Sequence, residues 1–236
     1  MARSYNAFAL LLTYPSNALQ ESASSAVDAV AEEALVPAPT VRALRRLADE
    51  LAGSDLYDLQ ERYVQVFDRT RSLSLNLYEH VHGESRDRGQ AMATLLELYR
   101  SRGLELSANE LPDHLPVFLE FLSTLPDEEA ASLLGEAAHV LAAIGERLHK
   151  RQSSYRAVFG ALAALGTGGA NAEALAALLS EPDDNPDDLA ALDTAWADTA
   201  VTFGPSDAGC PKVDSATRAR VAGLERPVRR FAAPAA

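Results

Sequence analysis

The chain has 236 residues and is 47% hydrophobic, which is enough to bury the core of one large domain. Its 34 acidic and 21 basic residues give a formal net charge of −13. This charge repels a phosphate backbone and argues against nucleic-acid binding, whereas it attracts cationic partners. Cys210 is the single cysteine, which excludes an internal disulfide and a multi-thiolate metal or iron–sulfur site. We therefore expect a cytoplasmic protein without a bound cofactor.

Composition also indicates the fold class. The chain is rich in Ala, Leu and Glu, and only 6% of its residues are aromatic, which favours helices over strands. The apolar stretch at residues 7–12 is too short for an export signal or a membrane span. No other segment supplies the roughly 20 consecutive apolar residues that a bilayer crossing needs. An all-α protein that does not span a membrane is the prediction.

The predicted elements of the N-terminal half are amphipathic helices. Apolar residues recur at i, i+3, i+4 and i+7 within residues 27–34. Two further helices are predicted over about residues 40–52 and 54–68, with Gly53 as the stop between them. The irregular pattern at residues 69–84 predicts a structured connection with short helical turns. We expect functional residues in this connection, because sites are often carried by loops on a rigid scaffold.

The same apolar spacing continues through the centre of the chain. It appears at residues 92–99, 115–122 and 155–162. The longest stripe, at residues 130–148, predicts one central helix of about four to five turns. Pro126 and the acidic residues after it suit the start of that helix, and the basic residues at its end suit the negative end of the helix dipole.

The C-terminal region differs in composition. A Gly-rich break at residues 166–169 is followed by acidic sequence without Lys or Arg up to residue 211. We predict a single-domain helical bundle with a core at residues 1–165. An acidic helical extension at residues 166–205 is expected to pack on this core, and residues 206–236 are expected to form a mobile basic tail.

Two groups of residues are candidates for chemistry. His80 and His82 with His114 suggest a metal site, but residues two apart point to different sides of a helix, and no His-Glu-x-x-His pattern accompanies them. Asp113 and His114 precede an apolar run. They fit either the start of that helix, with Asp113 satisfying free N–H groups, or the mouth of a groove that grips a basic or polar peptide.

Catalytic motifs are missing from the sequence. There is no Gly-x-Ser-x-Gly elbow and no phosphate-binding Gly-x-x-x-x-Gly-Lys loop. The histidines and aspartates leave a helical metal-dependent phosphohydrolase as the alternative from another class, although repeated His-Asp pairs are absent. A purely structural subunit is a third possibility. The residues themselves favour a protein that holds another protein and is not an enzyme.

Three motifs occur in a recognisable order, YVQVFD at 63–68, SLNLYEHVHGESRDRG at 74–89 and LPDHLPVFLEFL at 111–122, and WADTAVTFG follows at 196–204. Together they resemble the NarJ-like nitrate reductase molybdenum cofactor assembly chaperones, which form the nitrate reductase delta subunit family within the wider TorD-like redox enzyme maturation proteins. The resemblance covers roughly residues 5–205. The TorD-like branch reads Glu-Pro-x-Asp-His where residues 110–114 read Glu-Leu-Pro-Asp-His, which favours the nitrate reductase branch.

The resemblance implies a chaperone that binds the N-terminal segment of a molybdoenzyme catalytic subunit, with respiratory nitrate reductase as the expected client. It would hold the apoenzyme for insertion of molybdenum cofactor and Fe–S clusters before membrane docking, and would meet the membrane only through the client. Helix-in-groove recognition requires an apolar trough with polar anchors at its rim. The expected trough residues are Tyr63, Phe67, Tyr78 and Phe118, and the expected rim residues are Asp68, Glu79, His80, His82, Asp113 and His114.

Overall fold

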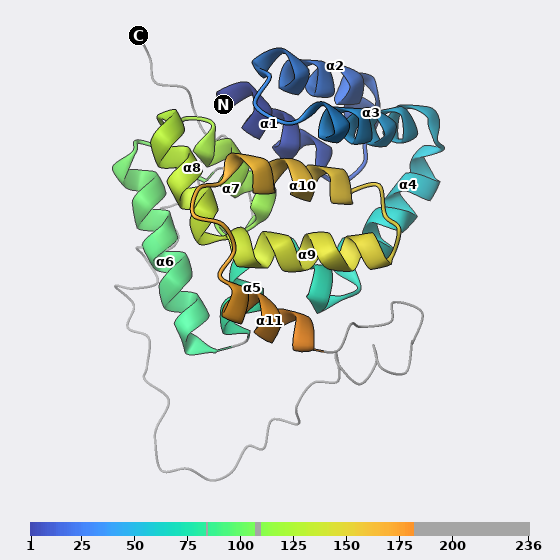
Figure 1. The fold of residues 1–236 in the computed structure, drawn as a ribbon. Helices are drawn as coiled ribbons and strands as arrows, with labels where there is room; N and C mark the ends of the chain where they lie inside the picture. Colours follow the sequence, from blue (N-terminus) through green and yellow to red (C-terminus); the bar gives the residue numbers. More distant parts are fainter. Residues whose placement is uncertain (84, 107–109, 182–236) are drawn as a thin grey trace, which may run out of the picture.

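The computed structural model describes residues 1–83, 85–106 and 110–181, which form a stack of α-helices (Figure 1). The predicted all-α class is confirmed, because the only β pairing among these residues is one isolated bridge. In chain order the α-helices are α1 (Ala2–Leu11), α2 (Asn17–Glu33), α3 (Ala38–Gly53), α4 (Leu56–Tyr63), α5 (Leu77–His82), α6 (Arg86–Ser101), α7 (Leu115–Leu122), α8 (Asp127–Glu136), α9 (Ala138–Lys150), α10 (Arg156–Leu165) and α11 (Ala172–Ser180). A π-helical turn, η1 (Val64–Asp68), continues α4, and a 3-10 turn, η2 (Arg71–Leu73), follows it.

The helices are stacked in layers. Helix α3 packs on α10, α10 packs on α9, and α9 packs on both α5 and α11, which lie together below it in Figure 1. Helix α1 lies against α2 on one side and α7 on the other. Helix α6 stands at the edge of the stack and contacts α5. The connection at residues 69–84 thus lies on the opposite side of α9 from α3 and α10.

One continuous core runs through the layers. Helix α7 is buried on nearly every side, and of its eight residues only Glu120 is not buried. A helix that is apolar all round belongs in the interior, which explains the run at residues 115–122. The core extends from the first helix to the last, and its fully buried members include Phe8, Leu47, Phe121, Ile144 and Leu162.

Most predicted elements are present with shifted ends. The helix expected at 40–52 is α3, which begins two residues earlier with Pro39 in its first turn. The helix expected at 54–68 is α4 plus the π-helical turn, in which the Arg69 amide donates to the Val64 carbonyl at 3.0 Å. Within the connection at 69–84, the expected helical turns are η2 and α5.

The prediction of one central helix at 130–148 is wrong. Helix α8 ends at Glu136, and α9 begins at Ala138 in a different direction (Figure 1). The cause is tertiary, because the linker after α10 lies against the last turn of α8. The Thr167 amide donates to the Ala131 carbonyl at 3.1 Å, and a Cβ at Gly135 would stand 2.0 Å from the Thr167 carbonyl oxygen. The predicted flanks are nevertheless correct, with acidic residues opening α8 and basic residues closing α9.

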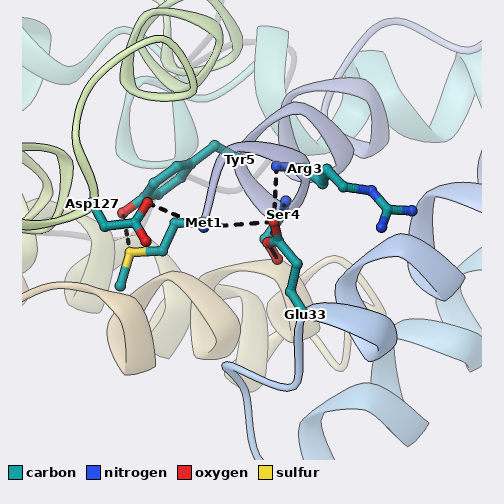
Figure 2. Close-up of polar contacts among 6 residues, drawn as sticks. All are labelled: Met1, Arg3, Ser4, Tyr5, Glu33 and Asp127. Carbon is teal, nitrogen blue, oxygen red and sulfur yellow. Dashed lines mark hydrogen bonds and ion pairs between the residues drawn. The ribbon is translucent and has the colours of Figure 1, made fainter.

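Polar contacts fasten the first helix to the rest of the bundle. Both the Ser4 amide and its hydroxyl donate to Glu33 Oε2, at 3.0 and 2.6 Å, which joins α1 to the end of α2 (Figure 2). The Met1 amine lies 3.2 Å from Asp127 Oδ1 at the start of α8. The start of α1 is therefore joined both to the end of α2 and to the start of the distant helix α8.

The described part of the predicted C-terminal extension is α11, which packs on α9. The rest of that extension, Cys210 and the predicted tail at 206–236 lie outside the described residues. Within the part of the chain that is described, no helix combines the length and apolar character needed to cross a bilayer.

Candidate functional site

The site is built where two distant segments pair. Asn76 and His114 form an antiparallel bridge, in which the Leu77 amide donates to the Asp113 carbonyl at 3.0 Å. The Leu115 amide donates in turn to the Leu75 carbonyl at 2.8 Å. The bridge lies directly before α5 on one strand and before α7 on the other, so it fixes the start of both helices.

Asp113 lies at the centre of this pairing. Its side chain is fully buried, and its Oδ2 accepts the Tyr78 amide at 3.1 Å, in the first turn of α5. The sequence suggested that Asp113 satisfies the N–H groups of its own helix, but α7 has no side-chain cap, and Asp113 caps α5 instead. The Tyr99 hydroxyl donates to the Pro112 carbonyl at 2.7 Å and holds the turn that presents Asp113.

A charged network surrounds this carboxylate. Arg88 of α6 places Nη1 3.5 Å from Glu79 Oε1 and Nη2 3.9 Å from Asp113 Oδ2. Glu79 also accepts a hydrogen bond from the Ser74 hydroxyl. Desolvation by burial raises the pKa of Asp113, while the Tyr78 amide and the Arg88 guanidinium oppose that rise. The network therefore stabilises a carboxylate in a place that disfavours its charge.

Three polar atoms of this group have no hydrogen-bond partner among the described residues. They are Oδ1 of Asp113, Nε of Arg88 and Nδ1 of His114, and all are shielded from solvent. A buried polar group without a partner costs about 1–3 kcal/mol. Each such atom in a native structure requires an explanation, and three of the five found among the described residues lie in this group. They supply one acceptor, one donor and one titratable nitrogen.

The histidines do not converge on a common point. His80 Nε2 lies 2.8 Å from the Ser74 carbonyl, whereas His82 packs edge-on against Tyr78 with ring centroids 5.7 Å apart. Both belong to α5, so residues two apart diverge as the sequence indicated. No group of three potential metal ligands occurs among the described residues. Burial lowers the pKa of His80 and lowers that of His114 to about 4.

The predicted trough residues divide into separate groups. Tyr63 and Phe67 are buried in an aromatic cluster with Tyr155, where ring centroids of Phe67 and Tyr155 are 5.0 Å apart. The Tyr63 hydroxyl donates to the Leu12 carbonyl at 2.9 Å, so this ring is bonded into the core. Phe118 is likewise buried. In this conformation Tyr63, Phe67 and Phe118 are not accessible to a peptide. Contact between these residues and a client peptide stays a prediction.

Most of the predicted rim residues lie nearer the surface. Glu79, His80, His82 and His114 are half-buried around the bridge, and Asp68 is exposed at the end of η1. Asp113, also expected at the rim, is instead fully buried, and Tyr78, the fourth predicted trough residue, is half-buried. Two large apolar side chains, which the sequence reasoning did not select, are exposed on the same paired segments. They are Val81 of α5, 52% exposed, and Leu111, 41% exposed.

Two arginines were missed by the sequence reasoning. Arg88 lies inside the motif at 74–89, and its charge is the natural partner for nearby carboxylates. Arg147 is 2% exposed and donates to the Ser72 carbonyl at 2.9 Å and the Leu178 carbonyl at 2.6 Å. It stands three residues after Ile144 and one before Leu148, on the buried stripe of α9, so the helical period itself marks it as a buried cation.

Comparison with solved structures defines the class of fold. The chain is similar to the crystal structure of a putative redox enzyme maturation protein from Archaeoglobus fulgidus, with a TM-score of 0.51 and 22% identity. The match covers 69% of this chain and 91% of that chain. The chain thus shares the fold of that protein over most of the described residues.

The chain belongs to the nitrate reductase delta subunit family, whose model matches residues 33–161. It is 40% identical over 222 residues to the nitrate reductase molybdenum cofactor assembly chaperone NarJ of Escherichia coli strain K12. This match covers 92% of each chain. It is 38% identical to the probable chaperone NarW of the same strain, over 82% of this chain and 80% of that one. These relatives confirm the resemblance found in the motifs and the prediction of a maturation chaperone rather than an enzyme.

Proposed function

We propose that this protein is the assembly chaperone of a nitrate reductase, and that it binds the N-terminal segment of the apo catalytic subunit in the cytoplasm. The observation that carries the proposal is the 40% identity, over 92% of both chains, to a protein named for this task. The client is held for insertion of molybdenum cofactor and Fe–S clusters, and meets the membrane after release.

The surface around the bridge supports peptide binding at this place. Exposed apolar side chains, Val81 and Leu111, lie on the segments that present Asp113 and His114. A peptide-binding surface combines apolar contact area with a few polar anchors that fix register. Asp113 Oδ1 and Arg88 Nε are anchors of that kind, because each still lacks a partner among the described residues. They lie beneath the surface, so binding requires a local opening of the bridge.

Isothermal calorimetry tests the proposal with a synthetic peptide of the first residues of the co-expressed catalytic subunit. Asp113→Asn is the informative variant, because the amide oxygen still accepts the Tyr78 N–H and preserves the start of α5. We expect the loss of charge to weaken binding about tenfold, the scale of one charge-assisted hydrogen bond. Asp49→Asn, at an exposed position of α3 remote from the bridge, makes the same charge change and should bind like the unmodified protein.

Two results would contradict the proposal at different levels. If neither the peptide nor the apo-subunit binds the unmodified protein, the chaperone assignment to this client is wrong. If Asp113→Asn and Asp49→Asn both bind with unchanged affinity while circular dichroism shows native helicity, the client binds elsewhere on the molecule.

A further inference from the structure

Helix α11 (Ala172–Ser180) covers a large part of α9 but is weakly held. Leu178 is its only buried residue, and Leu175 and Leu179 are partly buried against the core. These three leucines form a stripe at i, i+3 and i+4, which is the pattern of a helix lying in an apolar groove. The rest of the helix faces outward, so α11 resembles a bound peptide more than a core helix.

A buried cation holds the C-terminal end of α11. The Arg147 guanidinium donates to the Leu178 carbonyl, in the last turn of α11, and with its other nitrogen to the Ser72 carbonyl of η2. Carbonyls in the last turn of a helix have no partner within the helix and carry the negative end of its dipole. The surface beneath α11 therefore recognises a helix by an apolar stripe and by its free C-terminal carbonyls.

The linker before α11 is built as a pivot. Thr167 is bonded to the Ala131 carbonyl of α8 and fixes the near end. Gly168 and Gly169 follow with φ of +86° and +66°, conformations in which glycine moves without steric cost. The Asn171 side-chain oxygen then accepts hydrogen bonds from the Glu173 and Ala174 amides, so α11 is capped by its own N-cap residue. These glycines leave the linker free to turn, and once away from α9 a helix of nine residues is only marginally stable in water.

The surface that α11 covers adjoins the proposed client site. Helix α9 packs on α5 and η2 as well as on α11. His80 of α5 bonds to the Ser74 carbonyl next to η2, the turn to which Arg147 is attached. The family model matches residues 33–161 and so includes α5, η2 and α9 but ends before α11.

We propose that α11 is an internal occupant of the client-binding surface, which the client displaces. The occupant that replaces it is an amphipathic helix of the client with apolar residues at i, i+3 and i+4 and free C-terminal carbonyls for Arg147. This inference rests on the proposed function, because it places the client segment on the α9 surface next to the bridge. Displacement makes the apparent affinity depend on the fraction of molecules in which α11 has left.

The test uses the full chain, the client N-terminal peptide and two variants of α11. Leu178→Ser removes the main apolar contact of α11 and leaves the surface beneath it unchanged. Ala176→Ser, at an exposed position of the same helix, is the matched control. We expect Leu178→Ser to bind the peptide about tenfold more tightly than the unmodified protein, and Ala176→Ser to bind equally. Hydrogen exchange at residues 172–180 should rise when the peptide is added to the unmodified protein.

The outcomes separate this inference from the proposed function. Peptide binding with equal affinity by all three proteins, or binding that leaves α11 amides protected, would overturn the displacement of α11 while leaving the chaperone function intact. Failure of all three to bind the peptide would overturn both. Fast exchange of α11 in Leu178→Ser without peptide verifies that the substitution loosens this helix.

Discussion

Asp113, Arg88 and His114 each carry a buried polar atom without a hydrogen-bond partner among the described residues, and His114 Nδ1 also lies 3.9 Å from Glu110 Oε2. Asp113 satisfies the start of α5 with one oxygen and leaves the other without a partner among the described residues. The cap on α5 explains why Oδ2 is buried, but it does not explain the burial of Oδ1. These groups have already lost their water in the free protein. A client that forms hydrogen bonds with them would therefore bind without a further desolvation penalty at these atoms, which increases the affinity of a preformed site.

His114 gives this region a predictable pH dependence. Burial lowers its folded pKa to about 4, below the value of about 6.5 in an unfolded chain, so folding favours the neutral ring. Its contribution to stability is therefore complete above pH 6.5 and is lost as the pH falls toward 4. We expect protonation of His114 to lower the free energy of unfolding by about 2 kcal/mol when the pH falls from 7 to 5.

Urea unfolding at the two pH values measures this dependence. In His114→Gln the decrease between pH 7 and pH 5 should be smaller by that amount, because the titrating group is gone. His149→Gln, at an exposed position at the end of α9, should retain the full decrease. An identical decrease in His114→Gln and the unmodified protein would show that the ring does not titrate as its burial indicates.

At the scale of elements, the linker after α10 is anchored on α8 before α11 begins. Gly135 allows the Thr167 carbonyl to approach the α8 backbone, and Thr167 fixes the linker to Ala131. Separate helices α8 and α9 let α9 present one side to α10 and the other to α5 and α11.

Two glycine substitutions test this close approach. Gly135→Ala places a Cβ 2.0 Å from a backbone oxygen that cannot easily move, so we expect it to lower the free energy of unfolding by about 1–3 kcal/mol. Gly160→Ala in α10 meets nothing within 4 Å and should raise it by about 0.5–1 kcal/mol. Chemical denaturation measures both. Stabilisation by Gly135→Ala would mean that the linker does not rest on α8.

At the scale of the whole molecule, we expect the net charge of −13 to affect the rate at which the proposed client segment is captured. A basic client segment is attracted over a distance set by the Debye length, about 10 Å at 0.1 M salt. Contacts in the complex are shorter than this and are screened less. Charge is therefore expected to act mainly on association.

Stopped-flow measurements at several salt concentrations test this expectation. Between about 0.05 and 0.5 M NaCl, the association rate constant should fall by about tenfold, while the dissociation rate constant changes little. A client peptide with its basic residues replaced by Gln is the control and should show almost no salt dependence. Equal salt dependence for both peptides would exclude long-range attraction.

The sequence by itself determined the fold class, most helices and the family. Apolar residues at helical spacing depend only on the helical period, so stripes such as 115–122 identified a buried helix without its neighbours. The motifs at 63–122 identified the family, and the comparisons confirmed it. Helical periodicity depends on residues close together in the sequence, and a family motif is defined by the residue order itself, so neither requires tertiary structure.

Only the tertiary structure decided which residues meet. Asp113 caps α5, 35 residues earlier, and no spacing rule predicts that partner. Ala137 ends a helix that the periodic stripe would continue, because a linker 30 residues later packs on α8. Tyr63 and Phe67 match a site motif but are buried with Tyr155. Long-range hydrogen bonds and close backbone approaches are set by packing, and packing is the information that a linear pattern lacks.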